Sequence, residues 1–347
     1  MLGPLVVDIQ GTSLGSEDRE LLLHPLIGGV ILFARNYVEV EQLSSLCEEI
    51  KHLRSPSPSL LVMVDQEGGS VQRFQNGFTT LPALGALGKV YDSDASEAIN
   101  LTRDCAWMMS SELLAAGVDL SLAPVLDINS AESEVIGARA FHSESVVVSE
   151  LALIYIATMH QCGMRSVGKH FPGHGSVIAD SHKELPFDFR ELKQIERNDL
   201  IPFINGIKAG LSAVMMAHVS YPSVDRAPAG YSRVWISDIL KSHHKFSGLV
   251  MSDDLTMAGA ANYDSYIDRA LASFTAGCDA LLICNNRSAV EELLSASTNA
   301  FDEFQLKSLE LVRGVAADQD LKALQSSQKW RDIRARIEML ESASEAH

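Results

Sequence analysis

Eight short, continuously apolar segments recur along the chain, and this repetition constrains the fold more than any other feature. A strand that is buried on both faces has such an unbroken apolar pattern, whereas a strand with one face in water alternates. The segments are therefore predicted to be the strands of a parallel sheet covered by helices. They span residues 4–9, 26–33, 60–65, 118–125, 164–169, 212–218, 247–252 and 279–284.

Amphipathic segments of helical length separate these strands, and four of them end at a glycine that leads directly into the next strand. The expected helices include residues 39–54, 95–116, 143–161, 191–209 and 264–276. A glycine in the left-handed conformation ends a helix and turns the chain toward the sheet. Eight strands that alternate with helices predict an α/β fold, most simply a closed (β/α)8 TIM barrel, with an open doubly wound sheet as the alternative. The four glycines are Gly117, Gly163, Gly210 and Gly277.

The chain has 347 residues, which fits either one large barrel or two smaller domains. No linker rich in proline, glycine or serine divides it, so a single domain is favoured. We expect a catalytic barrel over residues 1–300 and a helical extension over residues 301–347 that packs on the outside of the barrel. Trp330 and Leu340 are expected to bury against the barrel.

Charge and composition narrow the class of protein. The formal net charge is −17, because 45 acidic residues outweigh 28 lysines and arginines. This charge repels nucleic acid and an anionic lipid surface alike, so neither partner is expected. We expect no signal peptide, anchor or membrane span, and the five cysteines lack a CxxC pair. A cytoplasmic protein with reduced thiols is therefore expected, and we take it to be a monomer.

Polar residues follow most of the predicted strands, where a barrel carries its chemistry. The densest group is the segment 169–184, KHFPGHGSVIADSHKE, which contains three histidines and two glycines. Gly173 and Gly175 would let this loop bend sharply and would permit a movement of His182 on substrate binding. At their spacing Asp180 can accept the imidazole proton of His182 and orient the ring, although two surface residues that never meet are an equal alternative.

Two further segments place carboxylates at strand ends. In GLVMSDDLTMAGA, Asp253 is expected at the barrel mouth, and Asp254 is expected to cap a following helix. In VDQEGGSVQRF, Asp65 and Arg73 can bind the hydroxyl groups of a polar substrate, or they can form a structural ion pair. A catalytic metal is not expected, because the histidines show neither HxH nor HExxH spacing.

Six motifs together resemble the family 3 glycoside hydrolases, and in particular the single-domain bacterial β-N-acetylhexosaminidases of peptidoglycan recycling. The resemblance covers residues 1 to about 300, and the ordered occurrence of KHFPGHG, DSH and SDD is highly specific. It implies an enzyme without a cofactor that cleaves terminal N-acetylglucosamine from 1,6-anhydro-muropeptides with retention of configuration. The motifs are KHFPGHG (169–175), DSHKELP (180–186), VDQEGGSVQRF (64–74), IGARAF (136–141), MMAHVSY (215–221) and MSDDLTM (251–257).

The resemblance also implies roles for individual residues. Asp253 matches the nucleophile that attacks the anomeric carbon, and His182 matches the general acid and base, with Asp180 as its partner. These types suit the reaction, because retention needs a carboxylate on one face of the sugar and a proton donor at the departing oxygen. An imidazole, with a pKa of about 6.5, needs little tuning for that task. Substrate-binding positions are matched by Asp65, Arg73, Arg139, Lys169 and His170.

Three positions depart from the usual form of the family motifs. Gln66 stands where histidine is frequent, Ser70 where arginine is frequent, and Ala140 where serine is expected. We expect these departures to affect substrate preference more than activity. A phosphorylase on the same barrel, a catalytically silent sugar-binding protein and a metal-dependent hydrolase are the alternatives to a metal-free glycosidase.

Overall fold

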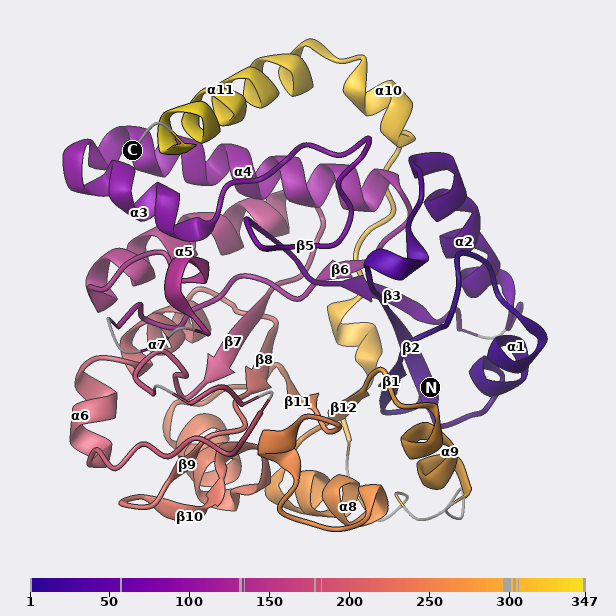
Figure 1. Cartoon of the computed structure of the whole chain (residues 1–347), viewed down its shortest axis with the longest axis vertical. Helices are drawn as coiled ribbons and strands as arrows, with labels where there is room; N and C mark the ends of the chain where they lie inside the picture. Colours follow the sequence, from indigo (N-terminus) through magenta and orange to yellow (C-terminus); the bar gives the residue numbers. More distant parts are fainter. Residues whose placement is uncertain are drawn as a thin grey trace.

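A parallel sheet of eight strands forms the centre of the computed structural model (Figure 1). Its order is β6-β3-β2-β1-β12-β11-β8-β7, and a bridge from Val125, which follows β6, to Lys169 of β7 joins its two edges. The sheet therefore closes, which confirms the predicted barrel. The eight strands are β1 (Leu5–Val7), β2 (Ile27–Leu32), β3 (Leu61–Val64), β6 (Leu120–Ser121), β7 (Val167–Phe171), β8 (Ala213–Met216), β11 (Leu249–Asp254) and β12 (Ala280–Ile283).

The structure describes residues 2–56, 58–130, 133, 135–177, 179–181, 183–295, 301, 304 and 306–345. Helices surround the strands of the barrel (Figure 1). They are α1 (Ser16–Leu22), α2 (Val40–His52), α3 (Leu84–Ser93), α4 (Ala95–Ala115), α5 (Ser145–Gln161), α6 (Leu192–Arg197), α7 (Leu200–Lys208), the π-helix η4 (Val234–His243), α8 (Tyr266–Ala276), α9 (Arg287–Ser295), α10 (Leu321–Gln325) and α11 (Gln328–Glu345). Among the described residues, no helix is both long and apolar enough to cross a bilayer.

The predicted glycine stops are present at all four helix ends. Gly117, Gly163, Gly210 and Gly277 have φ angles of +92°, +87°, +90° and +120°, a region that favours glycine. One expected helix is divided: residues 191–209 form α6 and α7. The break occurs at Asn198, whose φ of −133° and ψ of −77° are not helical.

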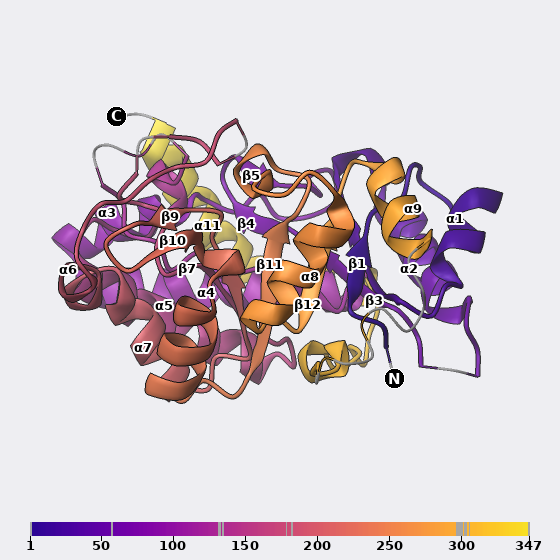
Figure 2. The ribbon, with the colours of Figure 1, turned by 90° about the horizontal axis from the view of Figure 1, so that it is seen from below.

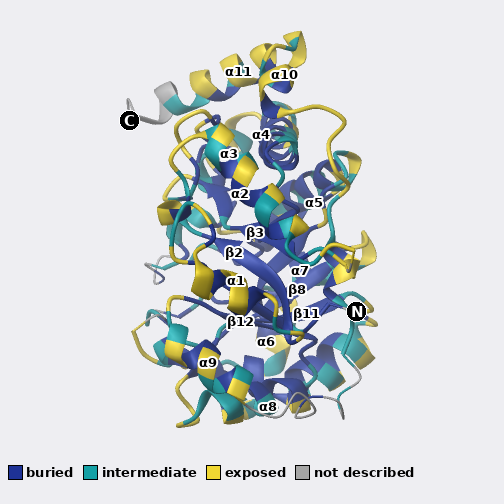
Figure 3. Cartoon of the chain, turned by 90° about the vertical axis from the view of Figure 1, so that its right-hand side faces the viewer, coloured by how far each residue is buried: buried dark blue, intermediate teal, exposed yellow. Residues whose placement is uncertain are grey.

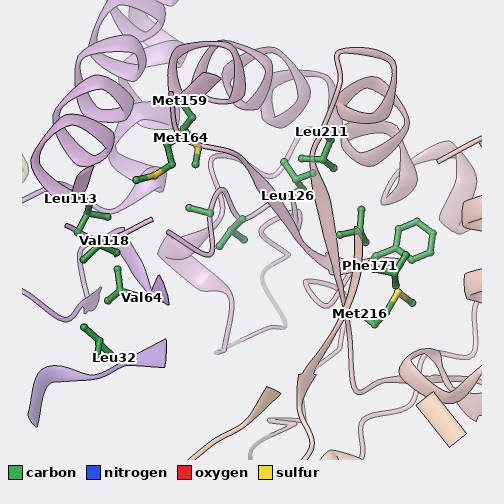
Figure 4. Close-up of a cluster of buried hydrophobic side chains, with 14 of the residues drawn as sticks. Leu32, Val64, Leu113, Val118, Leu126, Met159, Met164, Phe171, Leu211 and Met216 are labelled. Atoms are coloured by element: carbon green, nitrogen blue, oxygen red, sulfur yellow. The ribbon is translucent and has the colours of Figure 1, made fainter. Parts of the chain in front are cut away.

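The strands bury side chains on both faces, as their unbroken apolar pattern predicts. Val6 of β1 lies with apolar residues of all the other barrel strands in an interior cluster, whereas Leu5 and Val7 join the layer between strands and helices. Figure 4 shows part of that outer layer, where Leu113 of α4 and Phe171 of β7 belong to one cluster. In Figure 3 the barrel strands are almost entirely buried, and the outer helices expose one side.

The residues after the last strand close the barrel and cover one side of it. Leu309 and Val312 of a short helix, η6 (Leu309–Val312), are buried in the interior cluster. Farther along, α11 packs on α4, where Trp330 Nε1 donates a 2.8 Å hydrogen bond to Glu112. Leu340 packs partly buried against the same core. The division of the chain at residue 300 stays a prediction, because residues 296–300 lie outside the described part.

Candidate active site

A pocket of about 390 Å³ lies at the carboxyl ends of the barrel strands. Figure 2 shows the barrel from the side, with the hairpin of β4 (Gln66–Gly68) and β5 (Val71–Gln72) toward one end and the N-terminus toward the other. A second cavity of about 410 Å³ contains none of the predicted site residues. The first pocket brings together the predicted nucleophile and all five predicted substrate-binding residues: Asp65, Arg73, Arg139, Lys169, His170 and Asp253.

A network of charged side chains forms one wall of this pocket. Lys169 Nζ lies 2.8 Å from Asp65 Oδ1 and 2.6 Å from Glu67 Oε1. Arg139 donates two hydrogen bonds of 2.8 and 2.9 Å to the Glu67 carboxylate. Arg73 is more distant, 3.9 Å from Asp65. The Asp65 side chain is 19% exposed and that of Glu67 1%, so Asp65 can reach a substrate while Glu67 holds the cations from beneath.

The network keeps its members charged. Burial alone would raise the pKa of Glu67, but Lys169 and Arg139 lower it to about 2. Burial would likewise lower the pKa of Lys169, but Asp65 and Glu67 raise it above its ordinary value. Both groups are therefore ionised at neutral pH, and the wall presents fixed charges to the hydroxyl and amide groups of a ligand.

Glu67 was not identified from the sequence, although a signal was present. Successive strand residues point to opposite faces, so residues two positions apart share a face. Glu67 follows Asp65 by that spacing in VDQEGG, and the structure places both carboxylates on Lys169. A buried glutamate needs a cationic partner, and this one has two.

The segment of Asp253 and Asp254 matches its predicted placement in one respect and departs from it in another. Asp253 lines the pocket, and its Oδ1 accepts a 2.8 Å hydrogen bond from Asp254 N. Asp254 is structural: its Oδ1 accepts hydrogen bonds of 3.0 Å from both Thr256 N and Cys284 N. Burial raises the pKa of Asp254 to about 6.

The expectation that Asp254 caps a helix is wrong. The strand β11 continues through Asp254, which pairs with Leu282 of β12. Because its carboxylate bonds to the amides of a turn and of the neighbouring strand end, no helix starts there. The next α-helix, α8, begins at Tyr266 and is capped by Ser265, whose side chain accepts from Asp268 N.

His170 is oriented by a buried carboxylate. Asp127 Oδ2 lies 2.6 Å from His170 Nδ1, and the same carboxylate accepts hydrogen bonds from His170 N and His174 N. Burial would raise the pKa of Asp127, but the two histidines lower it below its ordinary value. Asp127 thereby fixes which ring nitrogen of His170 faces the pocket. The sequence placed Asp127 after the fourth strand but indicated no role for it.

The two glycines of the loop after β7 serve different purposes. Gly173 has a φ of +136°, which agrees with the expected sharp bend. Gly175 allows close approach, because a Cβ there would lie 1.8 Å from the carbonyl oxygen of Ile128. Tyr221 also donates a 2.7 Å hydrogen bond to the Gly173 carbonyl. The start of this loop is therefore packed tightly, and the expected movement of His182 on substrate binding stays a prediction.

The structure describes only one member of the predicted acid–base pair, Asp180. His182 lies outside the described residues, so its contact with Asp180 stays a prediction. The Asp180 carbonyl accepts backbone hydrogen bonds of 2.8 Å from Lys183 and 3.0 Å from Glu184, which places Asp180 in the expected tight turn. Its carboxylate lies 3.5 Å from Lys183 Nζ. Asp180 does not line the pocket.

Comparison with known proteins identifies the family. The sequence matches the family model described as glycosyl hydrolase family 3 N terminal domain over residues 6–310. The chain belongs to glycosyl hydrolase family 3. A relative named Beta-hexosaminidase from Tolumonas auensis is 45% identical over 339 residues, which cover 97% of this chain and 98% of the relative. One of the same name from Nitrosomonas eutropha is 46% identical over 338 residues, 97% of this chain and 96% of the relative.

A solved structure supports the same assignment. The crystal structure of NagZ from Neisseria gonorrhoeae in complex with N-trifluoroacetyl-D-glucosamine is 40% identical to this chain. It has a TM-score of 0.89, and the match covers 98% of both chains. The predicted resemblance and the predicted enzyme class, a glycoside hydrolase like the family 3 β-hexosaminidases, are confirmed.

The three departures from the family 3 motifs lie outside the pocket lining. The buried side chain of Gln66 accepts hydrogen bonds from Arg73 N and Phe74 N, at 3.0 and 3.1 Å, and so holds the hairpin that carries Arg73. Ser70 is exposed at the hairpin tip, and Ala140 is buried. Among the residues that the structure describes, no group of three His, Cys, Asp or Glu side chains is placed to hold a metal ion.

Proposed function

We propose that the protein is a retaining exo-β-N-acetylglucosaminidase. In this proposal it acts in the cytoplasm and removes terminal N-acetylglucosamine from 1,6-anhydro-muropeptides during peptidoglycan recycling. The observation that carries the proposal is the placement of Asp253 in one pocket with Asp65, Arg139 and Lys169. The pocket, of about 390 Å³, has the size of a site for a small ligand such as one N-acetylated sugar, which supports exo action.

The proposed reaction has two displacements at the anomeric carbon. Asp253 attacks this carbon and forms a glycosyl ester while the bond to the departing oxygen breaks, and His182 transfers its proton to that oxygen. His182 then takes a proton from water, whose oxygen displaces Asp253 and releases N-acetylglucosamine with its original configuration. Asp180 orients the imidazole and stabilises its charged form, as the third member of a triad does.

The nucleophile is tested by an Asp253→Ala variant with added azide. We expect turnover of an aryl N-acetyl-β-glucosaminide to fall by at least about 10³-fold, because the covalent step is lost. Azide can then take the vacated place and displace the aryl group directly, which yields the α-glycosyl azide. Asp318→Ala, at an exposed position outside the pocket, is the matched control and keeps the parental rate. Unchanged turnover in Asp253→Ala would remove this assignment.

The acid–base role of His182 is tested by the dependence on the leaving group. The natural disaccharide of this proposal is N-acetylglucosamine joined to 1,6-anhydro-N-acetylmuramic acid. His182→Ala should slow alkyl glycosides and this disaccharide far more than an activated 2,4-dinitrophenyl glycoside, whose phenolate departs without a proton. With azide this variant should yield the β-glycosyl azide, because Asp253 still forms the intermediate.

The choice between hydrolysis and phosphorolysis is tested by assays of the parental enzyme with and without phosphate. Free sugar as the product supports the proposal, and sugar 1-phosphate contradicts it.

A further inference from the structure

The chain is fixed at Ser181, the residue that directly precedes His182. Ser181 Oγ lies 2.9 Å from His174 Nε2, and the Ser181 carbonyl accepts a 2.8 Å hydrogen bond from Gly259 N. Only 2% of Ser181 is exposed, so water competes little for either bond. Ser181 therefore contacts two different segments, one through its side chain and one through its backbone.

Both partners of Ser181 are themselves held in place. His174 N donates a 2.7 Å hydrogen bond to Asp127 Oδ1. His174 Nδ1 is buried without a hydrogen-bond partner. Among the described residues, the contact with Ser181 is therefore the only hydrogen bond of the His174 ring. Gly259 lies in the loop that follows Asp253, and a Cβ there would come within 3.0 Å of the Ser181 carbonyl oxygen and 3.1 Å of His218 Cβ.

These contacts join the loop that carries His182 to the segment that follows Asp253 and its strand, β11. His174 and Ser181 belong to the loop after β7, and Gly259 belongs to the loop after β11. None of the three lines the pocket, so none of them is placed to touch the sugar. Proton donation and nucleophilic attack must occur on the same bond at the same time, and a displacement of about 1 Å between the groups lowers the rate.

We propose that Ser181, held by His174 and Gly259, is a positioning residue that sets the place of His182 relative to Asp253. The proposal rests on the proposed function, because it assigns Ser181 a share in the placement of the acid–base group. It differs from a merely structural role in one measurable respect. A misplaced acid slows the reaction in proportion to how much the leaving group needs a proton, whereas a general loss of stability affects all substrates alike.

The test compares Ser181→Ala with the matched control Ser176→Ala. Ser176 lies in the same loop, and its hydroxyl bonds to Asp199, away from Gly259. We expect Ser181→Ala to lower kcat/KM about 3- to 10-fold for the natural disaccharide, the size of one lost hydrogen bond. The 2,4-dinitrophenyl glycoside should lose less than about 2-fold, and Ser176→Ala should change neither. Equal losses on both substrates, or no loss on either, would overturn the proposal.

His174 variants test the same contact from its other side. His174→Gln keeps an N–H donor near the position of Nε2 and should retain most of the activity, whereas His174→Ala should reproduce the defect of Ser181→Ala. The double variant Ser181→Ala/His174→Ala should be no slower than His174→Ala alone, because both remove one interaction. The proposal would be contradicted if the losses of the two single variants multiplied in the double variant. It would also be contradicted by a His174→Gln variant as slow as His174→Ala.

The failure of this proposal can be separated from the failure of the proposed function. If the loss of rate in His182→Ala does not depend on the leaving group, the acid–base assignment fails. Amide hydrogen exchange then tests separately whether Ser181 holds the loop in place. Faster exchange across residues 176–184 in Ser181→Ala than in Ser176→Ala supports the positioning role, and equal exchange in the two variants contradicts it.

Discussion

At the scale of single residues, the pocket is organised by buried carboxylates that hold its cationic and imidazole side chains. Asp253, Lys169 and His170 were identified from motifs at strand ends, and the structure brings all three into one pocket. Glu67 and Asp127 were not, because the spacing of Glu67 from Asp65 indicates a shared face but not the cations that Glu67 meets, and Asp127 offers no such signal. Their sequence context shows where they lie along a strand but not which distant side chains surround them.

Glu67 provides the first prediction at this scale. Glu67→Gln leaves Lys169 and Arg139 close together without the negative charge between them. We expect the free energy of unfolding at pH 7 to fall by about 3 kcal/mol, as is usual when one partner of a buried ion pair is removed. Urea unfolding measures this change. Glu338→Gln, which affects an exposed pair with Arg334, is the control and should change stability by less than about 1 kcal/mol.

The pH dependence of the same variant follows from the lowered pKa. The pKa of Glu67 is about 2 in the folded protein against an ordinary 4.5, so its ionisation stabilises the fold above about pH 4.5. This contribution disappears as the pH falls from about 4.5 toward 2. Between pH 5 and about 3, the parental protein should therefore lose more stability than Glu67→Gln does. Parallel stability curves for the two proteins would contradict the low pKa.

At the scale of elements, the apolar runs predicted the strands because each is buried on both faces, and glycine stops predicted four helix ends. The break between α6 and α7 was missed. Near it Arg190, which precedes the expected helix, binds both Asp188 and Asp199, and the helical pattern treats Asp199 as an ordinary surface position. The helix after Asp254 was predicted wrongly, because an aspartate at a strand end can bond to a neighbouring strand as readily as to a helix. Local pattern does not distinguish such partners.

The loop after β7 provides the prediction at this scale. Gly175→Ala places a Cβ 1.8 Å from the Ile128 carbonyl oxygen, so the start of the loop must shift. We expect kcat/KM for the natural disaccharide to fall at least about 10-fold, because the displaced segment carries the proposed acid. Gly11→Ala is the control, since a Cβ there would lie 3.7 Å from the Ser13 carbonyl oxygen, an ordinary contact distance. An active Gly175→Ala variant with parental kinetics would show that the packing of this loop start does not matter.

At the scale of the whole molecule, the barrel depends on residues beyond its last strand. Leu309 and Val312 are buried inside it, and Trp330 packs against the helix layer. The sequence predicted that Trp330 buries, because a large aromatic residue on an amphipathic helix needs a partner surface. It did not predict that residues near 310 fill the barrel interior, because the pattern of a short apolar segment does not reveal which cavity it enters.

Two truncated chains test this dependence. A chain that ends at residue 300 lacks Leu309 and Val312 and leaves the interior cluster open at one end. We expect it to be unfolded or aggregated, whereas a chain that ends at residue 318 keeps these side chains and should retain a cooperative thermal transition. Circular dichroism during heating measures the difference. A folded, active chain of 300 residues would contradict this account of the barrel interior.

The central claim, that Asp253 forms a covalent bond to the sugar, is tested most directly by trapping. A 5-fluoro derivative of N-acetylglucosaminyl fluoride forms the glycosyl-enzyme readily and releases it slowly, because the ring fluorine destabilises the positively charged transition state. Intact-protein mass spectrometry should show one added glycosyl group, and peptide mapping should locate it on Asp253. A label on another residue, or steady turnover of this reagent without any labelled protein, would contradict the account.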